Sequence, residues 1–276
     1  MRPVQNTTKR KTWPVALTIA GSDSGGGAGI QADLKTFAAL GVHGASAIAC
    51  LTAQNPKAVL AVKACPPEVL RRQIEAVFAE LPPRAVKTGL LFSRENLRVV
   101  VDFFRAQTAR PRVPLVVDPV MASTSGAELL APTAKKILAE ELLPLATLVM
   151  PNLDEAGDLI GRRPKTAADI HRAARQIYER FGCAVLVKGG HLPGSATATD
   201  VLFDGATAVE LTASRVSGVR THGTGCTYSA AICAALALGN DLPAAARIGK
   251  RFVTSAIANS YRIGKHFALG RGCVDQ

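Results

Sequence analysis

The sequence has few aromatic residues and no long apolar stretch, and each of these features excludes a class of protein. Aromatic residues make up 5% of the chain, and no dense basic block follows the short basic run at 9–11, so the pattern of a nucleic-acid-binding protein is missing. Apolar stretches are short as well. The stretch at 230–238 comes nearest to the about 18 residues that a membrane-spanning helix requires. We therefore expect no nucleic-acid partner and no membrane span.

Cysteine motifs are missing too. The six cysteines form no C-x-x-C pair and no closely spaced cluster with histidine, which argues against the common zinc sites. The basic segment 1–13 lacks the apolar stretch of a secretory signal. A reducing compartment, the cytoplasm, is the simplest setting for such a chain.

The composition is that of an ordinary globular protein with a large positive charge. Of the 276 residues, 48% are hydrophobic and 20% are charged, which argues against disorder. Lysine and arginine number 33, and aspartate and glutamate number 21, so the formal net charge is +12. Such a surface attracts anions, and phosphorylated ligands are simple candidates.

Short apolar segments alternate with segments of helical periodicity. The expected strands are 15–20, 45–51, 86–88, 115–118, 148–150 and 184–188, with a hairpin of 201–203 and 208–211 that turns at Asp204 and Gly205. The expected helices are 30–37, 66–81, 97–104, 133–143, one from about 152, 167–181, 225–238 and 243–263. Continuous apolar strands between helices favour a mostly parallel sheet covered on both faces. We therefore predict one three-layer α/β/α domain over 14–276, after a flexible basic tail at 1–13.

In such a sheet ligands bind beyond the carboxyl ends of the strands, so the loops after strands are the candidate sites. The loop 21–29 is rich in glycine, which lets its backbone approach a ligand closely; a flexible turn is the alternative. Residues 27–32 also fit the dinucleotide pattern G-x-G-x-x-A. However, no acidic residue stands between Leu34 and Pro67 to bind a ribose, and the chain has no Walker-type phosphate loop. A nicotinamide-dependent oxidoreductase is therefore a poor alternative.

The loop 221–226 carries two glycines, Gly223 and Gly225, at the start of a helix. Backbone N–H groups converge there and the helix dipole adds about half a positive charge, which predicts an anion-binding site. Negative charge that develops during phosphoryl transfer would be stabilised at this point. Cys226 falls in the first helical turn, where the pKa of a thiol is lowered; a small buried helix residue is the alternative interpretation.

Polar residues follow three further strands. Asn152 and Glu155 have the spacing of a capping box, which is a sufficient structural explanation for both. The functional alternative is that they hold Mg²⁺ through water together with Asp118, because hard cations prefer oxygen ligands. Lys188 can contact a phosphate, although a solvated strand end is the alternative. Together these loops predict phosphoryl transfer, which depends mainly on positioning and charge neutralisation.

These motifs resemble those of the bacterial hydroxymethylpyrimidine/phosphomethylpyrimidine kinases of thiamine biosynthesis, within the ribokinase-like superfamily. The similarity extends over about residues 15–263. It rests on ALTIAGSDS at 16–24 with the following 25–33, LTAQN at 51–55, VDPVM at 117–121, PNLDE at 151–155, KGGH at 188–191 and THGTGC at 221–226. The resemblance implies the ribokinase-like form of the three-layer fold.

The same resemblance implies phosphorylation of 4-amino-5-hydroxymethyl-2-methylpyrimidine to its monophosphate and then to the diphosphate. ATP and Mg²⁺ are the implied cofactors, with an optional monovalent cation, and relatives suggest a homodimer. The implied site residues are Gly223, Thr224, Gly225, Cys226 and Lys188 in catalysis, Gly21, Asp33 and Gln54 around the pyrimidine, Lys188 and Thr221 at the nucleotide, and Asp118, Asn152 and Glu155 at the metal. An amide and a carboxylate suit an aminopyrimidine, which offers an amino donor and ring-nitrogen acceptors.

Two features set this chain apart from other ribokinase relatives. Many of them have an aspartate as catalytic base where this chain, like the pyrimidine kinases, has Cys226. The thiol could act as a base or only shape the anion hole, and we expect the backbone of 223–226 to contribute more. In addition, the Gly-Pro segment that often follows the last helix has no counterpart in 264–272.

Pyridoxal kinase is the nearest alternative function, because some relatives with this cysteine phosphorylate pyridoxal. Gln54 favours the pyrimidine, and dual activity stays open. A non-catalytic pyrimidine-binding protein is a second alternative. The complete set of Asp118, Glu155, Lys188 and the loop 223–226 argues against it.

Overall fold

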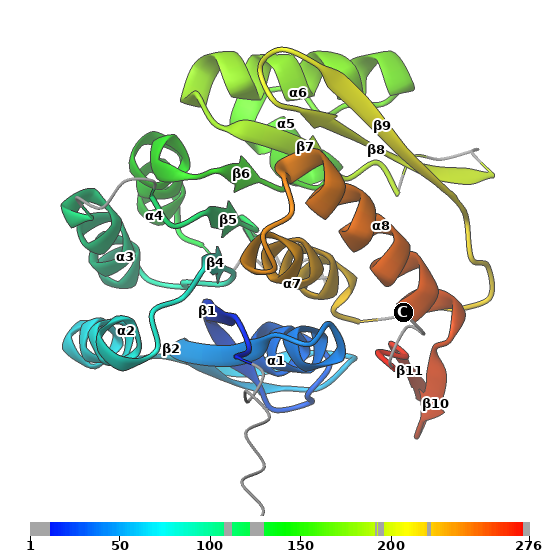
Figure 1. Cartoon of the computed structure of the whole chain (residues 1–276). Helices are drawn as coiled ribbons and strands as arrows, with labels where there is room; N and C mark the ends of the chain where they lie inside the picture. Colours follow the sequence, from blue (N-terminus) through cyan, green and yellow to red (C-terminus); the bar gives the residue numbers. More distant parts are fainter. Residues whose placement is uncertain are drawn as a thin grey trace, which may run out of the picture.

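A nine-stranded sheet forms the centre of this computed structural model (Figure 1). The structure describes residues 12–107, 112–121, 130–190, 192, 196–219 and 222–272. The strand order is β3-β2-β1-β4-β5-β6-β7-β8-β9. The strands are β1 (Val15–Asp23), β2 (His43–Gln54), β3 (Val59–Ala64), β4 (Ala85–Thr88), β5 (Leu115–Val117), β6 (Leu148–Val149), β7 (Ala184–Val187), β8 (Thr197–Phe203) and β9 (Ala208–Ser214). From β2 to β7 all neighbours are parallel, whereas β3, β8 and β9 pair antiparallel towards the two edges.

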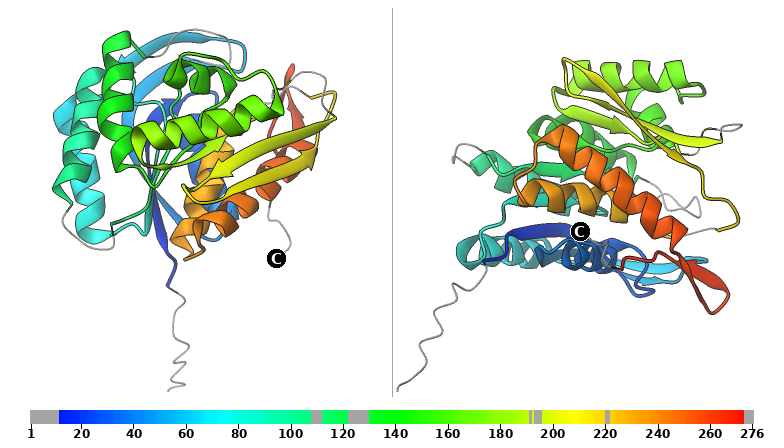
Figure 2. Two further views of the ribbon diagram at one scale, coloured as in Figure 1. Left: turned by 90° about the horizontal axis from the view of Figure 1, so that it is seen from above. Right: turned by 45° about the vertical axis from the view of Figure 1, so that its right-hand side comes forward.

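Helices cover both faces of this sheet. The α-helices are α1 (Gly29–Ala39), α2 (Pro67–Glu80), α3 (Arg94–Ala106), α4 (Pro132–Ile137), α5 (Leu153–Ile160), α6 (Ala167–Phe181), α7 (Thr224–Ala237) and α8 (Leu242–Ala258). In Figure 1, α2, α3 and α4 lie on one side of β4, β5 and β6, and α7 and α8 lie on the other; the two views in Figure 2 show the same layers. The predicted three-layer α/β/α fold is confirmed. Within the described ranges no helix has the length and apolar character to cross a membrane.

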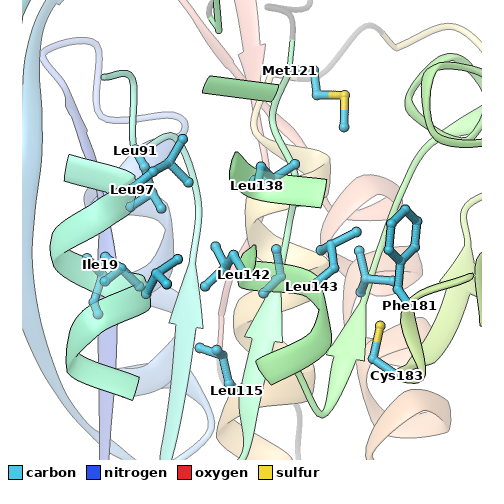
Figure 3. Close-up of a cluster of buried hydrophobic side chains, with 14 of the residues drawn as sticks. Ile19, Leu91, Leu97, Leu115, Met121, Leu138, Leu142, Leu143, Phe181 and Cys183 are labelled. Atoms are coloured by element: carbon cyan, nitrogen blue, oxygen red, sulfur yellow. The ribbon is translucent and has the colours of Figure 1, made fainter. Parts of the chain in front are cut away.

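Side chains of each central strand alternate between two hydrophobic cores. Leu17 and Ile19 of β1 belong to the core under α2–α6, while Ala16 belongs to the core under α1, α7 and α8. Val117 and Val116 of β5 divide in the same way. Figure 3 shows part of the first core. Because both faces are buried, the central parallel strands are mainly apolar, with Thr18 in β1 and Lys87 in β4 as buried exceptions, and this is why the sequence identifies them.

The structure differs from the sequence prediction at several elements. The predicted helix 133–143 is α-helical only to Ile137, and a π-helix (Leu138–Leu142) and a 3-10 helix (Leu143–Leu145) follow it. β1 continues past residue 20 to Asp23, because these residues still pair with β2. The edge strand β3 was not expected, since it is partly exposed and lacks a continuous buried run. The last helix ends at Ala258, and the chain then forms a separate hairpin of β10 (Tyr261–Ile263) and β11 (His266–Ala268). The β8–β9 hairpin is confirmed, and the predicted basic tail lies outside the described residues up to position 11.

Candidate active site

Three charged side chains meet where β5, β6 and β7 end. Asp118 follows β5, Glu155 lies in the first turn of α5 after β6, and Lys188 follows β7. Nζ of Lys188 donates to Oδ1 of Asp118 at 2.7 Å, and Oδ2 accepts from Oγ of Ser229 in α7 at 3.3 Å. Burial opposes the charged ammonium, but the charges of Asp118 and Glu155 outweigh it and raise the pKa of Lys188. Lys188 is therefore a fixed positive charge at this edge of the sheet.

The capping box predicted at the start of α5 is confirmed. Oδ1 of Asn152 accepts from the N–H groups of Asp154 and Glu155, both at 2.9 Å, and Oε2 of Glu155 accepts from the N–H of Asn152 at 2.8 Å. Glu155 is also only 6% exposed. Burial raises the pKa of Glu155; the charge of Lys188 acts against this and that of Asp118 adds to it. One carboxylate thus serves both the helix cap and the candidate site.

The charged groups suit a magnesium ion bound largely through water. Burial is the main reason why the pKa of Glu155 is raised, and the nearby charge of Asp118 adds to it; a divalent cation would favour the ionised form of both carboxylates. Oδ1 of Asn152 already accepts two N–H groups of the cap, so the role expected for Asn152 at the metal stays a prediction. No group of three or more histidine, cysteine or acidic side chains capable of holding a metal occurs among the described residues. Two carboxylates, those of Asp118 and Glu155, fit Mg²⁺ that keeps most of its water and binds phosphates, as Mg²⁺ commonly does.

The start of α7 has the geometry of a phosphate cradle. Gly223 is its N-cap with a φ of 84°, and a Cβ at this position would lie 1.9 Å from the carbonyl oxygen of Gly27, so only glycine fits. At Gly225 a Cβ would lie 3.4 Å from Oδ2 of Asp118 and 3.5 Å from Nζ of Lys188. The first turn, which includes Thr224, therefore lies beside the lysine. N–H groups of a first turn lack intrahelical partners and attract anions.

Cys226 occupies the first turn of α7, as predicted, and is partly buried. The expectation of a lowered thiol pKa is wrong. Burial raises the pKa of Cys226 to about 11, although the nearby ammonium of Lys87 acts in the opposite direction. The carboxylates of Asp33 and Asp118 add to the increase. The thiol is therefore protonated at neutral pH.

Asp23 organises the glycine-rich loop, a role that the sequence analysis missed. Its Oδ1 accepts from the N–H of Gly25 at 2.8 Å, and its Oδ2 accepts from the N–H groups of Gly27 at 3.1 Å and Ala28 at 2.8 Å. Burial opposes ionisation, but the hydrogen bonds from His222 and from the backbone lower the pKa of Asp23. An aspartate often accepts hydrogen bonds from the backbone N–H groups that follow it and so stabilises a turn. The position of Asp23 directly before the glycines therefore indicates this role in the sequence.

Two of the residues expected around the pyrimidine lie at this loop. Gln54 ends β2, and its Nε2 lies 2.9 Å from Nε2 of His222, which also contacts Asp23 at 3.1 Å. At Gly21 a Cβ would lie 2.7 Å from Sγ of Cys50, so the strand packs tightly there. His222, which precedes α7, thus connects the end of β2 with the glycine-rich loop through its contacts with Gln54 and Asp23. Thr221, expected at the nucleotide, lies outside the described residues.

Asp33, the third expected pyrimidine residue, is fully buried in an ion pair. Its two carboxylate oxygens accept from Nζ of Lys87 in β4 at 2.9 and 2.8 Å, and Oδ2 also accepts from Oγ1 of Thr18 at 2.6 Å. Burial raises the pKa of Asp33 although Lys87 counteracts it. Direct contact with a ligand would require this pair to open, so the role implied for Asp33 stays a prediction. Lys87 itself was missed, although it is a lysine inside an apolar strand.

Loss of the buried ammonium should destabilise the fold. We expect Lys87→Met to lower the free energy of unfolding by about 3–5 kcal/mol, because the carboxylate of Asp33 is left buried without a counter-charge. Urea unfolding would measure the change. The double variant Lys87→Met/Asp33→Leu should recover part of it. A single variant within about 0.5 kcal/mol of the parent, as for a surface substitution, would contradict this prediction.

A second buried pair holds the turn that carries Lys188. Oδ1 of Asp200 in β8 accepts from the N–H of Gly189 at 2.9 Å, and its Oδ2 accepts from Nζ of Lys250 in α8 at 2.7 Å. A Cβ at Gly189 would lie 2.1 Å from the carbonyl oxygen of Thr199, so the turn is pressed against β8. The pair fixes the backbone next to Lys188, and nothing in the local sequence pattern indicated it.

Comparison with known proteins connects this geometry to one family. The sequence profile of the phosphomethylpyrimidine kinase family matches residues 23–270. The chain is 49% identical over 261 residues to the hydroxymethylpyrimidine/phosphomethylpyrimidine kinase of Rhizobium meliloti. The aligned region covers 94% of this chain and 96% of that protein.

Solved structures show the same fold. An ADP complex of Bacillus subtilis pyridoxal kinase is 35% identical with a TM-score of 0.85, over 94% of this chain and 98% of that one. Clostridium difficile phosphomethylpyrimidine kinase is 42% identical with a TM-score of 0.77, over 88% of this chain and 99% of that one. The ribokinase-like architecture is therefore confirmed. With the profile match and the Rhizobium relative, it shows that this chain belongs to the phosphomethylpyrimidine kinase family.

Proposed function

We propose that this protein uses ATP to phosphorylate 4-amino-5-hydroxymethyl-2-methylpyrimidine and then its monophosphate, in thiamine biosynthesis. The observation that carries the proposal is the position of the first turn of α7 beside the Lys188–Asp118 pair. Relatives that are 44–49% identical over nearly all of the chain carry the name hydroxymethylpyrimidine/phosphomethylpyrimidine kinase, and related kinases have been solved with ADP and AMP-PCP.

In the first reaction the hydroxymethyl oxygen forms a bond to the γ-phosphorus of ATP. The bond from that phosphorus to the oxygen bridging to the β-phosphate breaks, ADP leaves, and the hydroxyl proton is released. The second reaction repeats this at an oxygen of the monophosphate. N–H groups at the start of α7 stabilise the negative charge on the transferred group, and Lys188 contacts the phosphates. Gln54 and Gly21 line the pyrimidine.

Asp118 and Glu155 are the residues that would hold Mg²⁺, through water and with Asn152 fixing the position of Glu155. When bound, the ion neutralises phosphate charge. Their proximity to Lys188 supports this assignment, since the same phosphates would contact the lysine and the ion.

Cys226 is expected to act through its position rather than as a base. Because the pKa of Cys226 is about 11 rather than about 8.5, iodoacetamide should alkylate it at neutral pH about 10²-fold more slowly than free cysteine. The rate should rise about tenfold per pH unit in alkaline solution, as the thiolate fraction does. Mass spectrometry of the peptide that contains Cys226 measures both.

The variant Cys226→Ala provides the kinetic counterpart. It should keep a turnover close to that of the parent, and Cys226→Asp should not improve it. A loss of about 10²–10⁴-fold in Cys226→Ala, the usual contribution of a general base, would show that the thiol takes the substrate proton.

Product analysis by mass tests the function itself. Purified protein is incubated with Mg-ATP and either hydroxymethylpyrimidine or pyridoxal. Mono- and diphosphorylated pyrimidine are the expected products. Pyridoxal kinase is the second candidate, because pyridoxal kinases are among the similar structures, one with a TM-score of 0.85. Pyridoxal phosphate as sole product would favour that candidate, and no product from either substrate would overturn both.

We further propose a homodimer, in the cytoplasm, formed through the β2–β3 edge. Leu60 in the edge strand β3 and Leu51 in the adjoining β2 are 74% and 56% exposed, and exposed apolar residues at or beside a sheet edge favour association. Leu60→Lys should therefore shift the mass measured by light scattering from dimer to monomer. Leu238→Lys, at a leucine 47% exposed after α7, is the matched control. A monomeric parent would contradict the prediction.

A further inference from the structure

The segment that follows the β10–β11 hairpin returns to the body of the protein. Leu269 is 2% exposed, and the N–H of Gly270 donates to the carbonyl oxygen of Ala256 in α8 at 2.9 Å. A Cβ at Gly270 would lie 2.1 Å from the carbonyl oxygen of Asn259. The segment is therefore held closely against the end of α8, which fixes the direction in which the next side chain, Arg271, leaves the backbone.

Arg271 joins two parts of the candidate active site. Its Nη2 donates to the carbonyl oxygen of Gly27 at 2.9 Å and to Oγ1 of Thr227 at 2.8 Å, and its Nε donates to the same Oγ1 at 3.0 Å. Gly27 belongs to the glycine-rich loop. Thr227 is fully buried in α7, directly after Cys226. The guanidinium therefore binds both the glycine-rich loop and α7, close to the point where Gly223 contacts Gly27.

The geometry requires a guanidinium. A planar fork can bind two acceptors in fixed directions, whereas a lysine ammonium is a point charge on a flexible stem. The carbonyl of Gly27 also contacts the Gly223 backbone so closely that a Cβ at Gly223 would lie 1.9 Å away. A shift of the glycine-rich loop away from α7 would therefore change the position of the N–H groups at residues 223–226.

We propose that Arg271 is a positioning residue for phosphoryl transfer, which holds the glycine-rich loop against the first turn of α7 and so sets the geometry of the phosphate cradle. The proposal rests on the function proposed above. Arg271 acts through Gly27 and Thr227. Its loss should therefore lower kcat more than it raises KM for ATP, since misplacing reacting groups affects the transition state most strongly.

The test compares Arg271→Ala and Arg271→Lys with the parent in the pyrimidine kinase assay. For Arg271→Ala we expect kcat to fall about 10²-fold, the order of effect of a misplacement by about one ångström. Arg271→Lys should recover only a part. Added methylguanidinium should restore turnover to the alanine variant and leave the lysine variant unchanged. Arg262→Ala, at an exposed arginine of the neighbouring hairpin, is the control and should match the parent.

Each other outcome has a distinct meaning. If Arg271→Ala keeps the parent kcat, the positioning role is wrong. If its loss of activity follows a loss of folded protein by urea unfolding, and methylguanidinium restores nothing, Arg271 stabilises the fold only and the proposal is overturned. If the parent itself forms no phosphorylated pyrimidine, the proposed function fails independently of Arg271.

Discussion

Replacing Gly223 with alanine is expected to lower kcat/KM for the pyrimidine kinase reaction by about 10²–10³-fold, the cost of losing one preorganised donor at a developing negative charge. The added Cβ would lie 1.9 Å from the carbonyl oxygen of Gly27. Backbone atoms cannot yield as a flexible side chain can, so either the glycine-rich loop or the start of α7 must move. Steady-state kinetics of the purified variant measure the effect.

A matched glycine separates this clash from backbone strain. Gly218 has a φ of 80°, close to the 84° of Gly223, but no atom lies within 4 Å of the position that a Cβ would take. Gly218→Ala carries a similar strain of about 1–3 kcal/mol and should keep the parent kcat/KM. Equal losses in the two variants would show that strain alone, and not the contact with Gly27, accounts for the effect.

Substitution of Lys188 by methionine should have a similarly large effect. The methionine keeps an unbranched side chain but removes the charge that pairs with Asp118 at 2.7 Å. We expect kcat/KM to fall about 10²–10³-fold, because a charge placed beside the transferred phosphate contributes to the transition state on this scale. Lys136→Met, at a lysine whose side chain is 71% exposed, should leave the rate unchanged, and Lys188→Arg should restore part of it.

The pH dependence of Lys188→Met tests the electrostatics separately. In the parent, burial raises the pKa of Glu155 while the charge of Lys188 lowers it. Without Lys188 the pKa of Glu155 should rise further, so the carboxylate becomes protonated at a higher pH. The acidic limb of the remaining activity should therefore move to higher pH than in the parent. An unchanged acidic limb would mean that ionised Glu155 does not limit the reaction.

The sequence predicts the sheet well because burial on both faces leaves a simple pattern. Leu17 and Ile19 face one core and Ala16 the other, so the first part of β1 is apolar except for the buried Thr18. β3 was not identified although its residues 59–62 are apolar, because exposure at the sheet edge is not visible in the sequence. The β10–β11 hairpin carries no such run, and its side chains are exposed or partly exposed.

The site is predicted less completely, because its chemistry depends on groups from distant parts of the chain. The position of Cys226 in a first helical turn follows from the sequence, but its raised pKa depends on burial and on Lys87, Asp33 and Asp118. Asp33 was identified by resemblance alone, and its ion pair with Lys87 joins α1 to β4. The contacts of Arg271 are equally non-local, and no short motif marks them.

The bond between Arg271 and Gly27 spans 244 positions of the chain, and this separation affects when the protein becomes competent during its synthesis. Segments near residue 27 leave the ribosome early, since a nascent chain emerges from its N-terminal side. The guanidinium that holds the glycine-rich loop emerges only after all eleven strands and all eight α-helices of the described ranges have been made. A chain still under translation therefore lacks this fastening.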